Sequence, residues 1–172
     1  MLYAASRAGA VPEYTTPTTV DVRPAQLSLT DTSSIESLVA TIKAEHGGCD
    51  IVINNAGVYY YRENITAQQR RDTFDANYRG TLRVCQAFIP IMRPSGRIVN
   101  LSSQSGQLRY FAPQLRKRFL EPNLTMAQLA YLVAEYNVSK LYRLSVSLAR
   151  SANYTHRTLL LKARKLNMAG RP

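Results

Sequence analysis

Two short runs rich in β-branched residues constrain the fold of this chain more than any other feature. Asp50–Ile53 and Arg97–Leu101 are too short for helices, and their composition is typical of parallel strands that are buried on both faces. Residues 66–92, which separate them, have the composition of two helices that end near Pro90–Pro94. Parallel strands need such a helical crossover. We therefore predict a doubly wound parallel α/β sheet.

The rest of the chain continues the alternation of strands and helices. Leu2–Ser6 is predicted to be a strand, and Leu27–Leu29 the end of another. Residues 107–134 are interpreted as an insert with a helical stretch near Thr125–Ala134, and Tyr136–Arg150 is predicted to be a long helix.

A further helix is predicted over Thr32–His46. Ser33 and Glu36 have the spacing of a capping box at its start, and Gly47-Gly48 terminates it. The face that we expect to be buried carries Ile35, Leu38, Val39 and Ile42.

Composition excludes several classes of protein. The two cysteines, Cys49 and Cys85, are too few for a disulfide framework, and the two isolated histidines predict no metal site. No apolar run reaches membrane-spanning length, and the N-terminus does not resemble a secretory signal. We therefore expect a cytoplasmic protein without a membrane span.

Charge is distributed unevenly along the chain. Residues 1–106 hold 10 basic and 9 acidic side chains, whereas residues 107–172 hold 12 basic and 2 acidic ones, a net charge of +10. Such asymmetry is compatible with a nucleic-acid contact, but no nucleic-acid-binding motif accompanies it. The preferred interpretation is a solvated insert and tail together with a pocket for an anionic cofactor.

Polar motifs occur at the ends of the two predicted central strands. Asn54-Asn55-Ala56-Gly57 comes directly after the first, where small residues let a flat nucleoside approach and asparagines can tie neighbouring strand ends together. Ser102-Ser103 ends the second, where a hydroxyl can hydrogen-bond a substrate carbonyl. Taken alone, the first motif is equally compatible with an ordinary polar turn, and a turn or a helix cap is the better interpretation of a lone serine pair.

Tyr136 and Lys140 are four residues apart, so they share one face of the predicted helix. A free tyrosine has a pKa of about 10, and a nearby ammonium favours the phenolate and lowers that pKa. The pair is then a candidate general acid or base, although two surface residues are the alternative. Asn77 is placed at the start of a helix, where it either caps the helix or holds an active-site water.

The order of these four motifs resembles the short-chain dehydrogenase/reductase family over about residues 1–150. The segment between Ser103 and Tyr136 resembles the insert of its carbonyl-reductase branch. The resemblance implies hydride transfer between a nicotinamide cofactor and a small carbonyl or alcohol substrate. It makes Tyr136 the proton donor or acceptor, Lys140 the ribose-binding residue, Ser103 the group that polarises the carbonyl, and Asn77 the holder of a relay water.

The resemblance also implies which residues meet the cofactor. Ser6-Arg7 replaces the acidic side chain that would bind the ribose of NAD, and an arginine there pairs with the 2′-phosphate of NADP, so NADP(H) is expected. Ser28, where the family has an aspartate, and the adjacent Leu29 are expected near the adenine. Asn55, Ala56 and Gly57, with Tyr136 and Lys140, complete the expected cofactor site.

The chain departs from the family at both ends. No TGxxxGxG turn for the cofactor pyrophosphate occurs in the sequence. The strand that would precede it is central, so Leu2–Ser6 and Asp50–Ile53 are expected to lack a shared neighbour. Thr158–Leu161 matches the next family strand, but the basic tail of residues 151–172 lacks the Pro-Gly turn. We therefore interpret the chain as an incomplete, truncated member, with a non-catalytic binding or regulatory relative and a nucleic-acid-binding module as alternatives.

Overall fold

A computed structural model describes residues 1–10, 19–60, 65–103, 106–138 and 159–160. Within these ranges the chain forms two compact units, one of residues 1–100 and one of residues from 101 onward. Residues 139–150 of the predicted helix Tyr136–Arg150 and most of the C-terminal tail lie outside the described residues.

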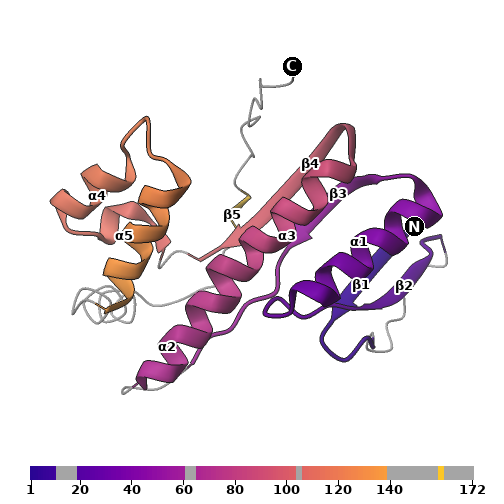
Figure 1. The fold of residues 1–172 in the computed structure, drawn as a ribbon, viewed down its shortest axis with the longest axis horizontal. Coiled ribbons are helices and arrows are strands. Elements are labelled where there is room, and N and C mark those ends of the chain that lie inside the picture. The colour runs from indigo at the N-terminus through magenta and orange to yellow at the C-terminus, as the bar shows by residue number, and fades with distance from the viewer. Residues whose placement is uncertain (11–18, 61–64, 104–105, 139–158, 161–172) are drawn as a thin grey trace. The chain divides into compact units, whose positions relative to one another are not determined.

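The first unit contains two pairs of parallel strands (Figure 1). β1 (Leu2–Ser6) pairs with β2 (Val22–Gln26), and β3 (Cys49–Asn54) pairs with β4 (Met92–Ser102). The parallel arrangement confirms the predicted class of sheet. Within the described residues β1 pairs only with β2, and β3 in this unit pairs only with β4.

The placement of β2 corrects the sequence prediction. The strand ends at Gln26, so Leu27–Leu29 lies beyond it rather than belonging to it. Pro24 lies within the strand and is paired in register with Ala4. A proline is tolerated here because β2 is an edge strand, whose outer side needs no hydrogen-bond donor.

Helix α1 spans Thr32–His46, as predicted, but its cap differs. The side chain of Asp31 accepts hydrogen bonds from the backbone amides of Ser33 and Ser34, so the predicted capping box of Ser33 and Glu36 is wrong. An aspartate satisfies these otherwise unpaired amides, and its hydrogen bonds to Ser33 and Ser34 lower its own pKa. Gly47 ends the helix in the left-handed conformation, with φ 70°.

The crossover from β3 to β4 is one continuous helical run. α2 (Ala67–Phe74) passes into a π-helical turn, η1 (Asp75–Gly80), and then into α3 (Thr81–Phe88) and a short 3₁₀ turn, η2 (Ile89–Ile91). The two predicted helices are therefore present, but the break that the prediction implied between them is not, because a π-helical turn joins them.

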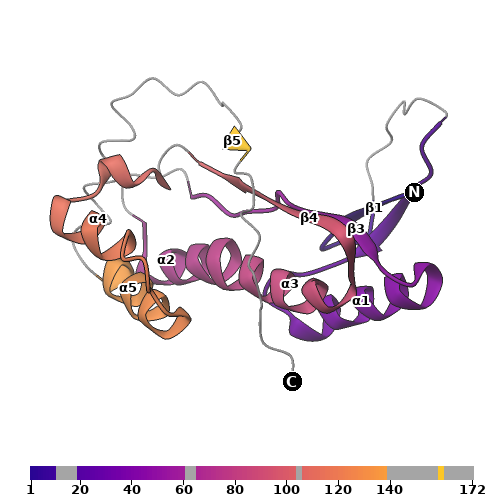
Figure 2. The same cartoon turned by 90° about the horizontal axis from the view of Figure 1, so that it is seen from above.

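The core of the first unit lies on one side of the strands. α1 and α3 both pack on that side, and Figure 2 shows the strands from their edge. Burial of apolar side chains between these layers is the main source of stability. The cluster consists of Ile35, Leu38, Ile42, Val52, Val84, Phe88 and Ile91.

The opposite face of β3 is uncovered by the described residues. Val52 points into the core, whereas Ile51 and Ile53, one residue away on either side, are 57% and 58% exposed. Leu2 on β1 is also exposed. Strands of a doubly wound sheet are normally buried on both faces, so this apolar surface is unusual for a folded protein.

The second unit is mainly helical. It contains η4 (Leu108–Tyr110), α4 (Pro113–Phe119) and α5 (Met126–Val138). α5 runs through Tyr136 without a break, so the predicted boundary between an insert helix and a catalytic helix is wrong. A two-residue strand, β5 (Leu159–Leu160), pairs antiparallel with the end of β4, which departs from the all-parallel order expected for Thr158–Leu161. Among the described residues, no helix is both long and apolar enough to cross a membrane.

Candidate functional site

The carboxyl ends of β3 and β4 are tied together by asparagine side chains. Asn54 is paired in register with Asn100, and its Nδ2 donates a hydrogen bond to Asn100 Oδ1 at 2.8 Å. The same amide lies 3.4 Å from Cys85 Sγ. Burial raises the pKa of the Cys85 thiol, which favours its protonated form. The predicted tie between strand ends is confirmed.

The next residues form an open surface. Asn55, Ala56 and Gly57 come directly after β3 and are all exposed. Ligands of open α/β sheets bind at this end of the strands. Small side chains leave the backbone accessible there, as a flat nucleoside requires.

Asn77 clamps the end of this loop. Its Oδ1 accepts a hydrogen bond from the Val58 amide at 2.7 Å, and its Nδ2 donates to the Val58 carbonyl at 2.9 Å. A Cβ added at Gly57 would lie 3.2 Å from Asn77 Oδ1, so the glycine leaves room for the clamp. Asn77 lies within η1, so the alternative that it caps a helix is wrong. π-helical turns occur frequently at functional sites.

Replacing Asn77 with alanine is expected to lower the free energy of unfolding by about 1–3 kcal/mol, because two hydrogen bonds are lost together. Asn55→Ala is the matched control, since Asn55 is an exposed asparagine of the same loop. Urea denaturation of both variants measures the difference. Equal losses in the two variants would show that the clamp does not stabilise the loop.

Three further predicted cofactor residues lie in the first unit. Arg7 comes directly after β1 and is exposed. The hydroxyl of Ser28 lies 3.2 Å from that of Thr30. Leu29 packs against the core, and a Cβ added at Gly80 would lie 2.7 Å from its Cβ. The side chain of Leu29 therefore faces the interior, and its backbone carbonyl accepts a hydrogen bond from Arg83 Nη1 at 3.1 Å.

The remaining predicted catalytic residues belong to the second unit. Ser103 comes directly after β4 and is exposed, and Tyr136 on α5 is half-buried. The ring centroids of Tyr136 and Phe111 are 5.2 Å apart. Lys140 lies outside the described residues. The structure therefore brings the loop of residues 54–57 together with Asn77, but it does not place Ser103 or Tyr136 relative to them.

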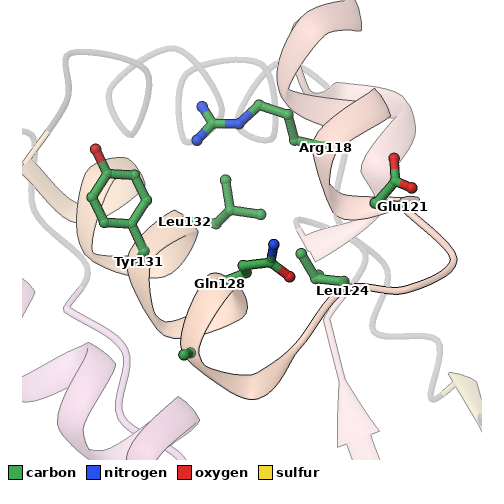
Figure 3. A pocket seen from close by; sticks show the side chains of 7 residues that line it. Arg118, Glu121, Leu124, Gln128, Tyr131 and Leu132 are labelled. Atoms are coloured by element: carbon green, nitrogen blue, oxygen red, sulfur yellow. The ribbon is translucent and has the colours of Figure 1, made fainter.

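Two cavities of the second unit were not found by sequence reasoning. One, of about 470 Å³, is lined by Leu132, Tyr131 and Gln128 of α5, with Arg118 of α4 (Figure 3). Arg118 forms a two-pronged salt bridge with Glu135, at 2.9 and 2.8 Å, and thereby lowers the pKa of that carboxyl. The aromatic and basic composition of residues 107–134 was the only signal for either cavity in the sequence.

Parallel strands with helical crossovers and polar loops at their carboxyl ends define a Rossmann-like α/β protein. The profile of the short chain dehydrogenase family matches residues 2–114, and the chain belongs to that family. It is 33% identical to carbonyl reductase (NADPH) 1 of Sus scrofa over 115 residues, which cover 64% of this chain and 40% of that protein. Identity to the Homo sapiens protein of the same name is 32%, over 64% of this chain and 42% of that one.

Solved structures show the same fold. Menthone neomenthol reductase from Mentha piperita has a TM-score of 0.61 and 26% identity, covering 67% of this chain and 54% of that one. Salutaridine reductase from Papaver somniferum has a TM-score of 0.60 and 24% identity, covering 76% and 55%. The chain spans about two fifths of the length of the two carbonyl reductases.

Proposed function

We propose that this chain is part of an NADP(H)-dependent oxidoreductase that interconverts a carbonyl compound and an alcohol by hydride transfer. The observation that carries the proposal is the exposed loop Asn55–Gly57 at the carboxyl end of β3, which Asn77 holds through Val58. The similarity to carbonyl reductases named for NADPH supports the same activity. In this proposal residues 1–150 form the family domain, with residues 107–134 as its insert.

Each catalytic side chain has a distinct proposed role. Tyr136 exchanges a proton with the substrate oxygen, and Lys140 favours the phenolate form that makes this exchange possible. Ser103 donates a hydrogen bond to the same oxygen, where negative charge develops. The loop held by Asn77 supplies a fixed surface for the cofactor. In this proposal Asn77 also holds a water that relays protons.

Part of the chain fits NADP(H). Arg7 is exposed at the carboxyl end of β1, and no described carboxylate lies within ion-pair distance of it, so its guanidinium is available for a phosphate. The exposed loop Asn55–Gly57 is open to a nucleoside. These residues suit the nucleoside and the 2′-phosphate of the cofactor. The sequence has no TGxxxGxG turn, which is the part that would bind the pyrophosphate. When bound, NADPH supplies the hydride.

Binding of NADPH tests the proposal without requiring turnover. Titration calorimetry is expected to show tighter binding of NADPH than of NADH. Arg7→Gln is expected to weaken NADPH binding about 10- to 100-fold and to leave NADH unchanged, because only NADPH carries the 2′-phosphate. Arg97→Gln, which removes an exposed arginine of β4, is the control.

Two outcomes would contradict the proposal. Folded chain that binds neither nucleotide would favour the non-catalytic alternative. Equal binding of NADPH and NADH would remove Arg7 from the site.

A further inference from the structure

We propose that a second cavity, beside α4, binds a small, flat organic anion. Its volume is about 550 Å³, which lies within the range of about 300–1,000 Å³ found for small-molecule sites. Among the described residues, three cations, Arg109, Arg116 and Lys117, line it together with a single carboxylate, Glu121. Its described lining includes none of the residues assigned to hydride transfer, although the ring of Phe111 packs against that of Tyr136, and the proposal goes beyond that function.

Among the described lining residues of the cavity, the three cations outnumber the one carboxylate. Among the described residues, no carboxylate lies within ion-pair distance of Arg116 or Lys117. Glu135, the other carboxylate of this unit, is already engaged by Arg118. An anionic ligand therefore gains attraction that the protein itself does not provide.

The walls of the cavity suit a flat apolar body. Phe111 lines it, and its ring lies 5.7 Å from that of Phe119 and 5.2 Å from that of Tyr136. Leu120 also lines it and is 56% exposed, so a ligand that covers it gains the free energy of apolar burial. An apolar wall beside unpaired cations recognises a molecule that has both an apolar body and an anionic group.

Arg109 is held in place for such contact. Its guanidinium carbon lies 4.9 Å from the centre of the Tyr110 ring, and its Nη2 donates to the Tyr110 hydroxyl at 2.9 Å. Fixing the side chain before binding reduces the entropy that binding costs. The cavity of Figure 3 has no unpaired cation among its described lining residues, because Arg118 is already paired with Glu135.

Titration calorimetry with 2-naphthoate tests the proposal, with the uncharged 2-naphthamide as the matched ligand. The double variant Arg116→Gln/Lys117→Gln is expected to bind 2-naphthoate about tenfold more weakly, because each exposed cation contributes modestly. Arg79→Gln/Arg97→Gln removes the same net charge from exposed positions of the first unit and is expected to bind as the unchanged chain does. Increasing salt is expected to weaken binding of the acid but not of the amide.

Several results would overturn the proposal. They are equal binding of acid and amide, equal weakening in both double variants, and no binding of the acid at all. A DNA duplex that binds tightly and is released by the Arg116→Gln/Lys117→Gln change would assign the surface to nucleic acid instead. None of these measurements uses NADPH, so failure here is distinguishable from failure of the proposed oxidoreductase function.

Discussion

Replacing Tyr136 with phenylalanine is expected to lower kcat/KM for carbonyl reduction by about 100- to 10,000-fold, the range typical of a lost general acid. The change removes only the hydroxyl, so the packing of the ring against Phe111, with centroids 5.2 Å apart, is retained. The dissociation constant for NADPH is expected to change little. Steady-state kinetics and calorimetry on the same preparation measure the two quantities.

Tyr131→Phe is the matched control for this prediction. Tyr131 lies on the same helix and is 67% exposed, so the loss of its hydroxyl is expected to leave kcat/KM unchanged. If Tyr136→Phe reduced carbonyls as fast as the unchanged protein, Tyr136 would not be the proton donor. A parallel loss of stability in the Tyr136 variant would point to packing rather than chemistry.

Replacing Ile35 with alanine is expected to lower the free energy of unfolding by about 2–5 kcal/mol. Ile35 is 1% exposed and packs in the core cluster of the first unit, so the change leaves a cavity that its neighbours cannot fully close. Urea denaturation followed by circular dichroism measures this loss.

Ile53→Ala is the same chemical change on the uncovered face of β3, where the side chain is 58% exposed. It is expected to cost less than about 1 kcal/mol, as for other surface substitutions. A loss as large as that for Ile35 would contradict this expectation and would show that another surface covers Ile53 in solution.

Local patterns in the sequence were enough to predict some elements. β3 and α1 were predicted because apolar spacing and helix-ending glycines act over a few residues. β2 was misplaced because Arg23 and Pro24 are untypical of strands, and only pairing with β1 makes them one. The continuity of α5 through Tyr136 likewise depends on packing within its unit rather than on a local signal.

Part of the candidate site could also be predicted from local patterns in the sequence. Asn54 and Asn100 end neighbouring parallel strands, so their contact is a consequence of the order of the strands. The bonds of Asn77 to Val58 join positions 19 residues apart and depend on a π-helical turn that no simple sequence pattern predicts. The cavity beside α4 is built by residues of a turn and a helix, so it becomes visible only in three dimensions.

The π-helical turn η1 changes the direction in which side chains point between the two parts of one long helical run. Each residue of an α-helix advances the direction of its side chain by about 100°, so the wider turn η1 offsets the side-chain directions of α2 from those of α3. α3 buries Val84 and Phe88, whereas α2, on the other side of the turn, buries no side chain. In evolutionary terms, deleting one residue of η1 would leave the packing of α3 in register with the core and rotate the residues of α2 out of register. Small insertions and deletions here would therefore shift Asn77, and the loop that it holds, relative to α3, and would also disturb the buried residues Ala76 and Gly80.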